Sequence, residues 1–217
     1  MSDGDPAADG PRPASRFTVH LGLLVTAAVV VLDQATKELA EALLDLGQFV
    51  PFLGERIGWQ LVYNPGAAFG LPAPVWLFLI VTVLVTTIVL RALPKTTSLL
   101  TATAYGLLLA GALGNAVDRL VRPNVVGQVS GFFQGDVVDF VAWGTFPRFN
   151  VADSAITVGF VLLTIALWRE ERALRAAEGI DDEGEAATEG QAPDTGAQAQ
   201  GTSTDARAQR AGAPETP

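Results

Sequence analysis

Four aspartates lie between two long apolar runs in the second half of the chain, and they are the residues best suited to do chemistry. The members of this group are Asp118, Asp136, Asp139 and Asp153. An ionisable side chain at or near membrane depth is costly, so such a residue is a functional candidate by default. We expect Asp139 and Asp153 to meet as a catalytic carboxylate pair at the membrane surface.

Such a pair could hydrolyse a peptide bond. Two carboxyl groups within hydrogen-bond reach cannot both be ionised near neutral pH, because their charges repel each other. The pair then titrates as a unit and can hold one water molecule. The ionised member takes a proton from the water as it attacks a peptide carbonyl, and the protonated member supplies a proton to the leaving amine. This reaction needs no metal and no cofactor.

The residues alone leave other interpretations open. Asp153 could only cap the helix that follows it, with Asp139 paired to Arg148. All four aspartates could instead hold Mg²⁺ in a membrane transferase, which predicts that a chelator abolishes activity. A proton-coupled transporter would use the carboxylates as a relay, but it predicts charged residues deeper within the spans. A small binding protein without activity is a further possibility.

Polar residues on either side of the pair could support it. Asn115, Asp118 and Arg119 share one helical side by their i, i+3 and i+4 spacing. Asp118 and Arg119 could form a structural clamp or could bind the backbone of a substrate. Asn150 stands before an apolar run, where it could cap a helix or orient a carboxylate.

Two pairs in the first third of the chain are further candidates. Asp33 and Lys37 are four residues apart and share a helical face, as an interfacial ion pair or as a functional one. Asn64 and Gly66 flank a proline in a turn signal, and this turn could approach a substrate or simply reverse the chain.

The composition is typical of an integral membrane protein. Hydrophobic residues make up 49% of the 217 residues, and the mean hydropathy is +0.34. The net charge of −9 comes mostly from residues 176–217, where nine acidic residues face two basic ones. Cysteine is absent, which excludes disulfides, a thiol nucleophile and a cysteine-ligated metal. The single histidine, His20, lies far along the chain from the aspartates, which disfavours a Ser-His-Asp triad.

Four apolar runs predict four membrane-spanning helices, each of about 20 residues. We expect an all-α membrane protein with spans at about 17–36, 73–92, 98–117 and 153–170. Alternating residues and glycines over 46–71 predict a small β element on the membrane, and 120–152 should be a polar loop. Residues 1–15 and 176–217 have the composition of disordered tails flanking one domain over 16–175.

The distribution of basic residues predicts the orientation. Four spans put both termini on one side, where seven basic residues flank the span ends, against five on the other side. The positive-inside rule then places both termini in the cytoplasm. The β element, the 120–153 loop and every candidate site residue should face outward.

Five short blocks, in this order, carry a resemblance to a known family. They are DQATK at 33–37, NPGAAFG at 64–70, GALGNAVDR at 111–119, VVDF at 137–140 and FNVADSAI at 149–156. Together they resemble lipoprotein signal peptidase, or signal peptidase II, a family of bacterial membrane aspartyl endopeptidases. The resemblance covers roughly residues 17–172.

The resemblance implies an activity and a set of site residues. The family cleaves prolipoproteins before a diacylglyceryl-modified cysteine in the bacterial cell membrane, and globomycin inhibits it. By resemblance, Asp139 and Asp153 are the catalytic pair, without a metal or cofactor. The implied supporting and substrate-binding residues are Asp33, Lys37, Asn64, Gly66, Gly114, Asn115, Asp118, Arg119, Asn150 and Ala152. We expect a monomer that contacts membrane lipids and binds no nucleic acid.

One segment departs from the family pattern. The stretch between Arg119 and Asp139 is longer than is usual, and it contains three glycines and the pair Phe132 and Phe133. We expect it to form a mobile flap that touches lipid.

Overall fold

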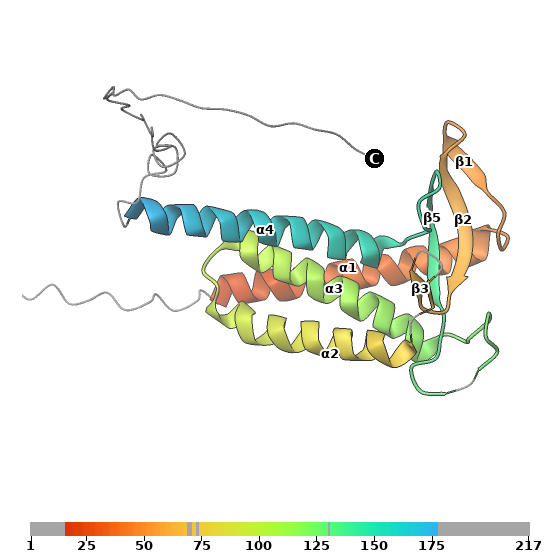
Figure 1. The fold of residues 1–217 in the computed structure, drawn as a ribbon, viewed down its shortest axis with the longest axis horizontal. Helices are drawn as coiled ribbons and strands as arrows, with labels where there is room; N and C mark the ends of the chain where they lie inside the picture. Colours follow the sequence, from red (N-terminus) through yellow and green to blue (C-terminus); the bar gives the residue numbers. More distant parts are fainter. Residues whose placement is uncertain (1–15, 69–70, 73, 130, 178–217) are drawn as a thin grey trace, which may run out of the picture. The chain divides into compact units, whose positions relative to one another are not determined.

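The computed structural model describes residues 16–68, 71–72, 74–129 and 131–177. Its four long helices are α1 (Arg16–Leu43), α2 (Val75–Ala92), α3 (Leu99–Val121) and α4 (Val151–Ala177) (Figure 1). All four are long and apolar enough to cross a membrane, as the sequence predicts. The tails predicted to be disordered, residues 1–15 and nearly all of 176–217, lie outside the described residues.

The boundaries of the helices follow local signals. A 3₁₀ turn, η1 (Leu93–Lys95), carries Pro94 and separates α2 from α3. Ser98 caps α3, because its side chain accepts a hydrogen bond from the N–H of Thr101. The helix α1 continues past the predicted span, which ends at about residue 36, to Leu43. Asp33 and Lys37 therefore lie on one helix, as their spacing predicts.

The third helix is the most buried of the four described spans. Small residues allow its backbone to approach its neighbours closely. A Cβ atom on Gly106 would lie 2.6 Å from the carbonyl oxygen of Gly22 in α1, and one on Gly111 would lie 2.4 Å from that of Ala152 in α4. The glycines therefore let α3 pack tightly against both α1 and α4.

A three-stranded antiparallel sheet lies at one end of the helices (Figure 1). Its order is β1 (Val50–Leu53), β2 (Ile57–Asn64) and β5 (Val137–Trp143). A short separate hairpin pairs β3 (Ala67–Ala68) with β4 (Leu71–Pro72). The register of β2 against β5 pairs Val62 with Asp139, so the predicted β element receives a third strand from the long loop.

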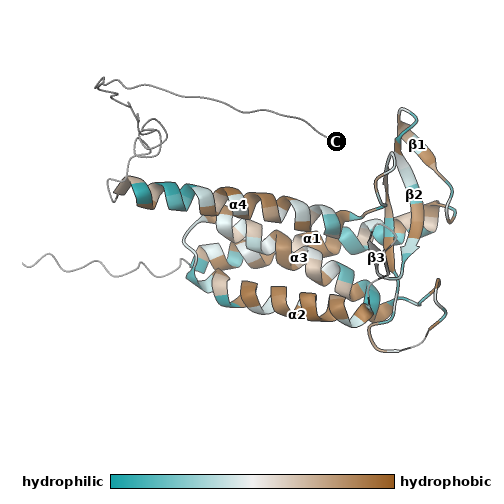
Figure 2. Cartoon of the chain, in the orientation of Figure 1, coloured by the Kyte–Doolittle hydropathy of each residue, from teal (hydrophilic) through white to brown (hydrophobic). Residues whose placement is uncertain are grey.

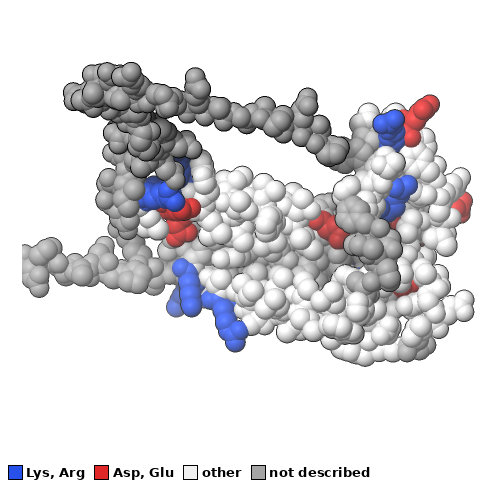
Figure 3. Space-filling model, viewed as in Figure 1, with Lys and Arg blue, Asp and Glu red and all other residues white. Residues whose placement is uncertain are grey.

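The lateral surfaces of the helices are apolar. In α2 only Val89 is buried, and large side chains such as Ile80 and Leu84 are more than half exposed. Figure 2 shows hydrophobic residues along the helices, and Figure 3 shows charged side chains gathered toward their two ends. This distribution suits helices surrounded by lipid.

Candidate active site

Asp139 is a buried carboxyl group in the middle of β5. The whole residue is only 2% exposed. Asn150 Nδ2 donates to Asp139 Oδ1 at 2.7 Å, and Asn64 Nδ2 donates to Asp139 Oδ2 at 3.0 Å. Arg148 binds Gln60 and the carbonyl oxygens of Gly144 and Phe146 instead. The interpretation in which Asp139 pairs with Arg148 is therefore wrong.

Asp153 lies in the first turn of α4 and has two roles. Its backbone N–H donates to Asn150 Oδ1 at 2.9 Å, and the Asn150 N–H donates to Asp153 Oδ2 at 3.2 Å. This reciprocal pair has the form of a capping box, so Asp153 does help to begin the helix. Its other oxygen accepts a hydrogen bond from Asn115 Nδ2 at 2.8 Å, which leaves it turned toward α3 and the site.

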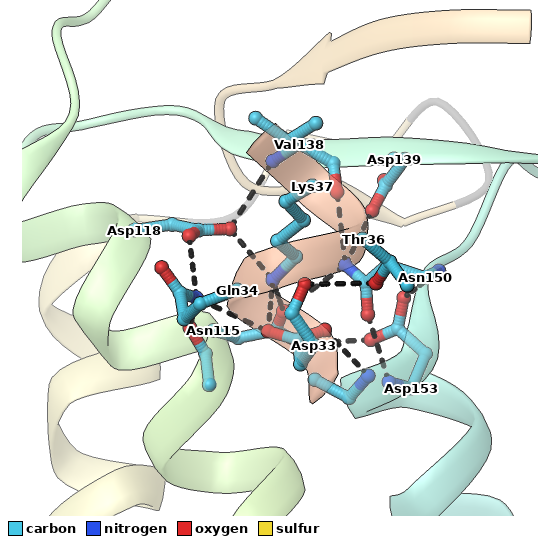
Figure 4. A network of polar contacts seen from close by, with 12 residues as sticks. Asp33, Gln34, Thr36, Lys37, Asn115, Asp118, Val138, Asp139, Asn150 and Asp153 are labelled. Carbon is cyan, nitrogen blue, oxygen red and sulfur yellow. Dashed lines mark hydrogen bonds and ion pairs between the residues drawn. The ribbon is translucent and has the colours of Figure 1, made fainter. Parts of the chain in front are cut away.

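Asn150 joins the two carboxyl groups. It contacts Asp139 through its side-chain amide and Asp153 through both its backbone N–H and its side-chain oxygen (Figure 4). It is completely buried, so these bonds fix its orientation. Sequence reasoning left its role open between a helix cap and a residue that orients a carboxylate. In the structure Asn150 makes the contacts of a cap with Asp153 and also donates to the Asp139 carboxylate.

Burial and the neighbouring Asp153 carboxylate raise the pKa of Asp139 from its ordinary value of 3.8 to about 7. The hydrogen bonds from Asn64 and Asn150 and the positive charge of Lys37 lower this pKa, but they do not offset the desolvation. The site can therefore retain a carboxyl proton near neutral pH.

A buried lysine organises the polar residues next to this pair. Lys37 Nζ lies 2.8 Å from Asp33 Oδ2, 2.7 Å from Asp118 Oδ2 and 3.1 Å from Asn115 Oδ1. Figure 4 shows Lys37 between Asp33 and Asp118, and all three residues are fully buried. The three contacts match the three donors of an ammonium group, so the network is complete on the lysine side.

The network reaches the first turn of α4 through Asp33. The backbone N–H of Ala152, next to Asp153, donates to Asp33 Oδ1 at 2.8 Å. A Cβ atom on Gly114 would lie 2.7 Å from Asp33 Oδ2 and 3.1 Å from the Ala152 Cβ. Glycine is therefore required at position 114 because the carboxylate occupies the space that a side chain would need.

Asp118 connects the network to β5 and to residues that sequence reasoning missed. Val138, beside Asp139, donates its N–H to Asp118 Oδ2 at 3.3 Å. Gln34 Nε2 and Arg122 Nε each donate to Asp118 Oδ1 at 3.0 Å. The i, i+4 spacing of Asp118 and Arg122 was the available signal for this arginine.

Arg122 continues the contacts toward α1 and β2. It forms ion pairs with Glu38 and Glu41, and the Tyr63 hydroxyl donates to Glu41 Oε1 at 3.0 Å. The hydroxyl pKa of Tyr63 is raised by burial and by the Glu41 carboxylate. These contacts join the sheet to the ends of two helices.

Arg119 is buried beside the pair and is sparsely bonded. It is 6% exposed, its guanidinium carbon lies 4.3 Å from the centre of the Phe78 ring, and its Nη1 donates to the Asn115 carbonyl at 3.2 Å. Within the described residues this is the single hydrogen bond of the Arg119 side chain, which carries five N–H donors.

Gly66 shapes the turn that presents Asn64. The Gly66 N–H donates to Asn64 Oδ1 at 2.9 Å, and its φ of 114° favours glycine. Because this bond occupies the Asn64 oxygen, the Asn64 amide nitrogen is directed to Asp139.

Asp136 is separate from the pair. Its Oδ2 accepts the N–H groups of Val125 and Val126 at 2.7 and 2.9 Å. The structure therefore divides the four aspartates among three environments, and in the part of the chain it describes no three acidic or histidine side chains form a metal-binding group. The geometry gives no support to a magnesium site built from all four.

Comparison with known proteins decides the family. A family model described as Signal peptidase (SPase) II matches residues 25–169. A lipoprotein signal peptidase of Rhodococcus jostii is 41% identical over 76% of this chain and 81% of its own length, and one of Pseudomonas paraeruginosa is 39% identical over 72% and 93%. The chain belongs to the signal peptidase II family.

A solved structure agrees with this assignment. A bacterial membrane enzyme determined by the in meso method at 2.3 Å resolution matches with a TM-score of 0.60 and 30% identity, over 73% of this chain and 92% of that chain. The chain is therefore a multi-pass bacterial membrane protein and an aspartic endopeptidase of the signal peptidase II family. The transporter and non-catalytic interpretations are set aside by this membership.

Proposed function

We propose that this protein removes signal peptides from prolipoproteins by cleaving before a diacylglyceryl-modified cysteine, with Asp139 and Asp153 activating a water molecule. The observation that carries the proposal is that the buried Asp139 carboxyl and the partly buried Asp153 carboxyl both bind Asn150. No ion pair to Asp139 or Asp153 is found among the described residues, so neither charge is neutralised by a direct contact.

The proposed mechanism uses one proton shared by the pair. Asp139 has a pKa of about 7, so we assign the protonated state to it at the start of the reaction. Asp153 accepts hydrogen bonds from the Asn115 amide and the Asn150 N–H, which suit a carboxylate. Asp153 then takes the proton from the attacking water, and Asp139 polarises the peptide carbonyl and protonates the leaving amine.

The residues around the pair have separate proposed roles. Arg119 keeps free donors beside the pair, which suits binding of substrate carbonyl oxygens. Asn64 and Gly66 orient Asp139, Asn115 orients Asp153, and Asn150 orients both carboxyls. The buried network of Asp33, Lys37, Gly114, Asp118 and Ala152 holds these groups in register without contacting the substrate.

We also propose the orientation and the limits of the active unit. The pair lies at the sheet end of the helices. Arg91 lies in the last turn of α2, Lys95 ends η1, and Arg169 lies in the last third of α4, away from the sheet. Figure 3 shows Lys and Arg side chains gathered at the end of the helices opposite the sheet. The positive-inside rule then puts both termini in the cytoplasm and the site on the outer face. Residues 16–175 form the peptidase domain, and one copy suffices because a single chain supplies every group. Globomycin-type inhibitors should compete for this site.

A cleavage assay in detergent tests the proposal. The substrate is a synthetic diacylglyceryl prolipoprotein peptide, with an unlipidated peptide as the control for the lipid requirement. Cleavage that survives EDTA and requires the diacylglyceryl group supports a metal-free lipoprotein peptidase. Cleavage abolished by EDTA and restored by Mg²⁺ would instead support the metal-dependent alternative.

A further inference from the structure

The loop between α3 and β5 displays apolar side chains on its outside. No charged residue occurs between Arg122 and Asp136. Within the described residues of this loop, 122–129 and 131–135, the exposed fraction is 57% for Val126, 53% for Val129 and 75% for Phe132. Exposed apolar patches mark contact with another apolar phase. By contrast, the β1–β2 turn contains the charged pair Glu55 and Arg56.

Two polar side chains of this loop, Asn124 and Asp136, bind groups within the loop itself. The fully buried Asp136 accepts the N–H groups of Val125 and Val126, and Asn124 Nδ2 donates to the Gln134 carbonyl at 2.7 Å. The Gly127 N–H donates to Asn124 Oδ1 at 2.6 Å. Gln128 is exposed, but the other exposed residues among those described in the loop are apolar or glycine, which is unusual for a loop that faces water.

The backbone conformation at two neighbouring phenylalanines places one side chain inside the loop and the other outside. Phe133 adopts a φ of 63°, a left-handed conformation that a bulky residue rarely takes. Its ring is 3% exposed, whereas the ring of Phe132 is 75% exposed. The strained residue therefore sends one ring inward and presents the other outward.

The apolar surface of the loop continues that of a membrane span. Leu120 and Val121, in the last turn of α3, are 53% and 70% exposed. The loop leaves α3 directly after them, at the end of the helices that carries the sheet (Figures 1 and 2). The lipid that surrounds this span is thus also the surrounding medium nearest to the loop.

We propose that this loop docks into the membrane surface at the sheet end of the helices, with Val126, Val129 and Phe132 entering the lipid. Burying their apolar surface among acyl chains is favourable, and the absence of charge removes the main cost of insertion. The proposal concerns a segment outside the catalytic pair and does not depend on the proposed mechanism.

Docking would connect the lipid surface to the catalytic strand. Asp136, which anchors the loop, precedes Asp139 by three residues on the same segment. The Gly135 N–H donates to the Arg119 carbonyl at 3.0 Å. Because the loop is bonded to the ends of both α3 and β5, its position in the membrane would fix the height of the pair relative to the lipid.

Fluorescence quenching in proteoliposomes tests the proposal. The chain lacks cysteine, so single substitutions Phe132→Cys and Val126→Cys can each carry an environment-sensitive fluorophore in the full-length protein. Both positions are exposed, so the label should not disturb folding. Glu55→Cys in the exposed β1–β2 turn is the aqueous control, and Leu84→Cys on the exposed face of α2 is the mid-membrane control.

The vesicles contain phosphatidylethanolamine, phosphatidylglycerol and lipids spin-labelled near the headgroup or deep in the acyl chain. We expect the shallow spin label to quench positions 126 and 132 at least threefold more than position 55. The deep spin label should quench position 84 most. If positions 126 and 132 respond to aqueous iodide as position 55 does and not to the spin-labelled lipids, the loop faces water or a protein and the proposal fails.

Discussion

At the scale of single residues, the site depends on where protons and charges are held. Asp139 and Asp153 share their contacts through Asn150, whereas Asp33 and Asp118 share the Lys37 ammonium. The first pair keeps a carboxyl group free of ion pairs, and the second pair is neutralised. Aspartate carboxyl groups at the same end of the helices therefore differ in whether an ion pair balances their charge.

The pH dependence of cleavage should report the pKa of Asp139. Above pH 7 the proton of Asp139 is lost, and kcat should fall about tenfold per pH unit because the general acid is missing. Steady-state rates between pH 5 and 9 on a lipidated peptide measure this. A rate that stays constant up to pH 9 would show that Asp139 does not act as the acid.

The same raised pKa has a consequence for stability. A folded-state pKa of about 7 lies above the ordinary value of 3.8, so the native state binds the proton more tightly. The resulting stabilisation is fully present below pH 3.8 and is lost as the pH rises through about 7. Asp139→Asn should remove this dependence.

Removal of the buried ammonium should destabilise the fold. Lys37→Met leaves Asp33 and Asp118 buried without a shared counter-charge, which should cost about 3–5 kcal/mol in the free energy of unfolding. Denaturant unfolding in detergent measures the effect. Lys95→Met, at an exposed lysine at the other end of the helices, is the control and should change little. Equal effects of the two substitutions would contradict the role of Lys37.

At the scale of elements, the site forms where α1, α3, α4 and β5 meet. The sequence predicted the four spans, because long apolar runs leave few alternatives. It also pointed to Asp33, Asn64, Asp118, Asp139 and Asp153 as candidates, because they lie in short motifs. These residues are brought together in the structure by contacts between distant elements.

Contacts set by strand register and by helix ends were not predictable from local pattern. The pairing of Val62 with Asp139 joins segments on either side of two helices, and no local periodicity encodes it. The contacts of Arg122 with Glu41 and of Glu41 with Tyr63 join the end of α3, α1 and β2, which are far apart in the chain. Asp136 was one of the four aspartates of the alternative magnesium site, but in the structure its carboxylate binds the N–H groups of Val125 and Val126 and anchors the loop.

The junction of the sheet with α1 and α3 allows a matched comparison of two glutamates. The Glu41 side chain is 24% exposed and binds both Arg122 and Tyr63, whereas that of Glu38 is 72% exposed and binds Arg122. Glu41→Gln should lower the free energy of unfolding by about 1–2 kcal/mol, and Glu38→Gln by less than about 0.5 kcal/mol. Thermal unfolding of both variants tests this order, and a larger loss from Glu38→Gln would reverse the assignment.

At the scale of the whole molecule, all groups of the site come from one part of the chain. The family match ends at residue 169, and the last residue proposed to act is Asp153. A protein truncated after Ala177 should therefore cleave the lipidated peptide within about twofold of the full chain, since it keeps the whole family match and every residue proposed to act. A loss of tenfold or more in kcat/KM, with unchanged unfolding, would show that residues 178–217 contribute to catalysis.

The most direct test of the account is single-turnover cleavage of a diacylglyceryl prolipoprotein peptide by Asp139→Asn, Asp153→Asn and Asp45→Asn. Asp45 is exposed in the segment that follows α1, so its substitution removes a carboxylate outside the site. We predict losses of about 10²–10⁴-fold for each member of the pair and little change for Asp45→Asn, with all three proteins folded. A well-folded Asp139→Asn or Asp153→Asn protein that cleaves at the normal rate would contradict the catalytic pair.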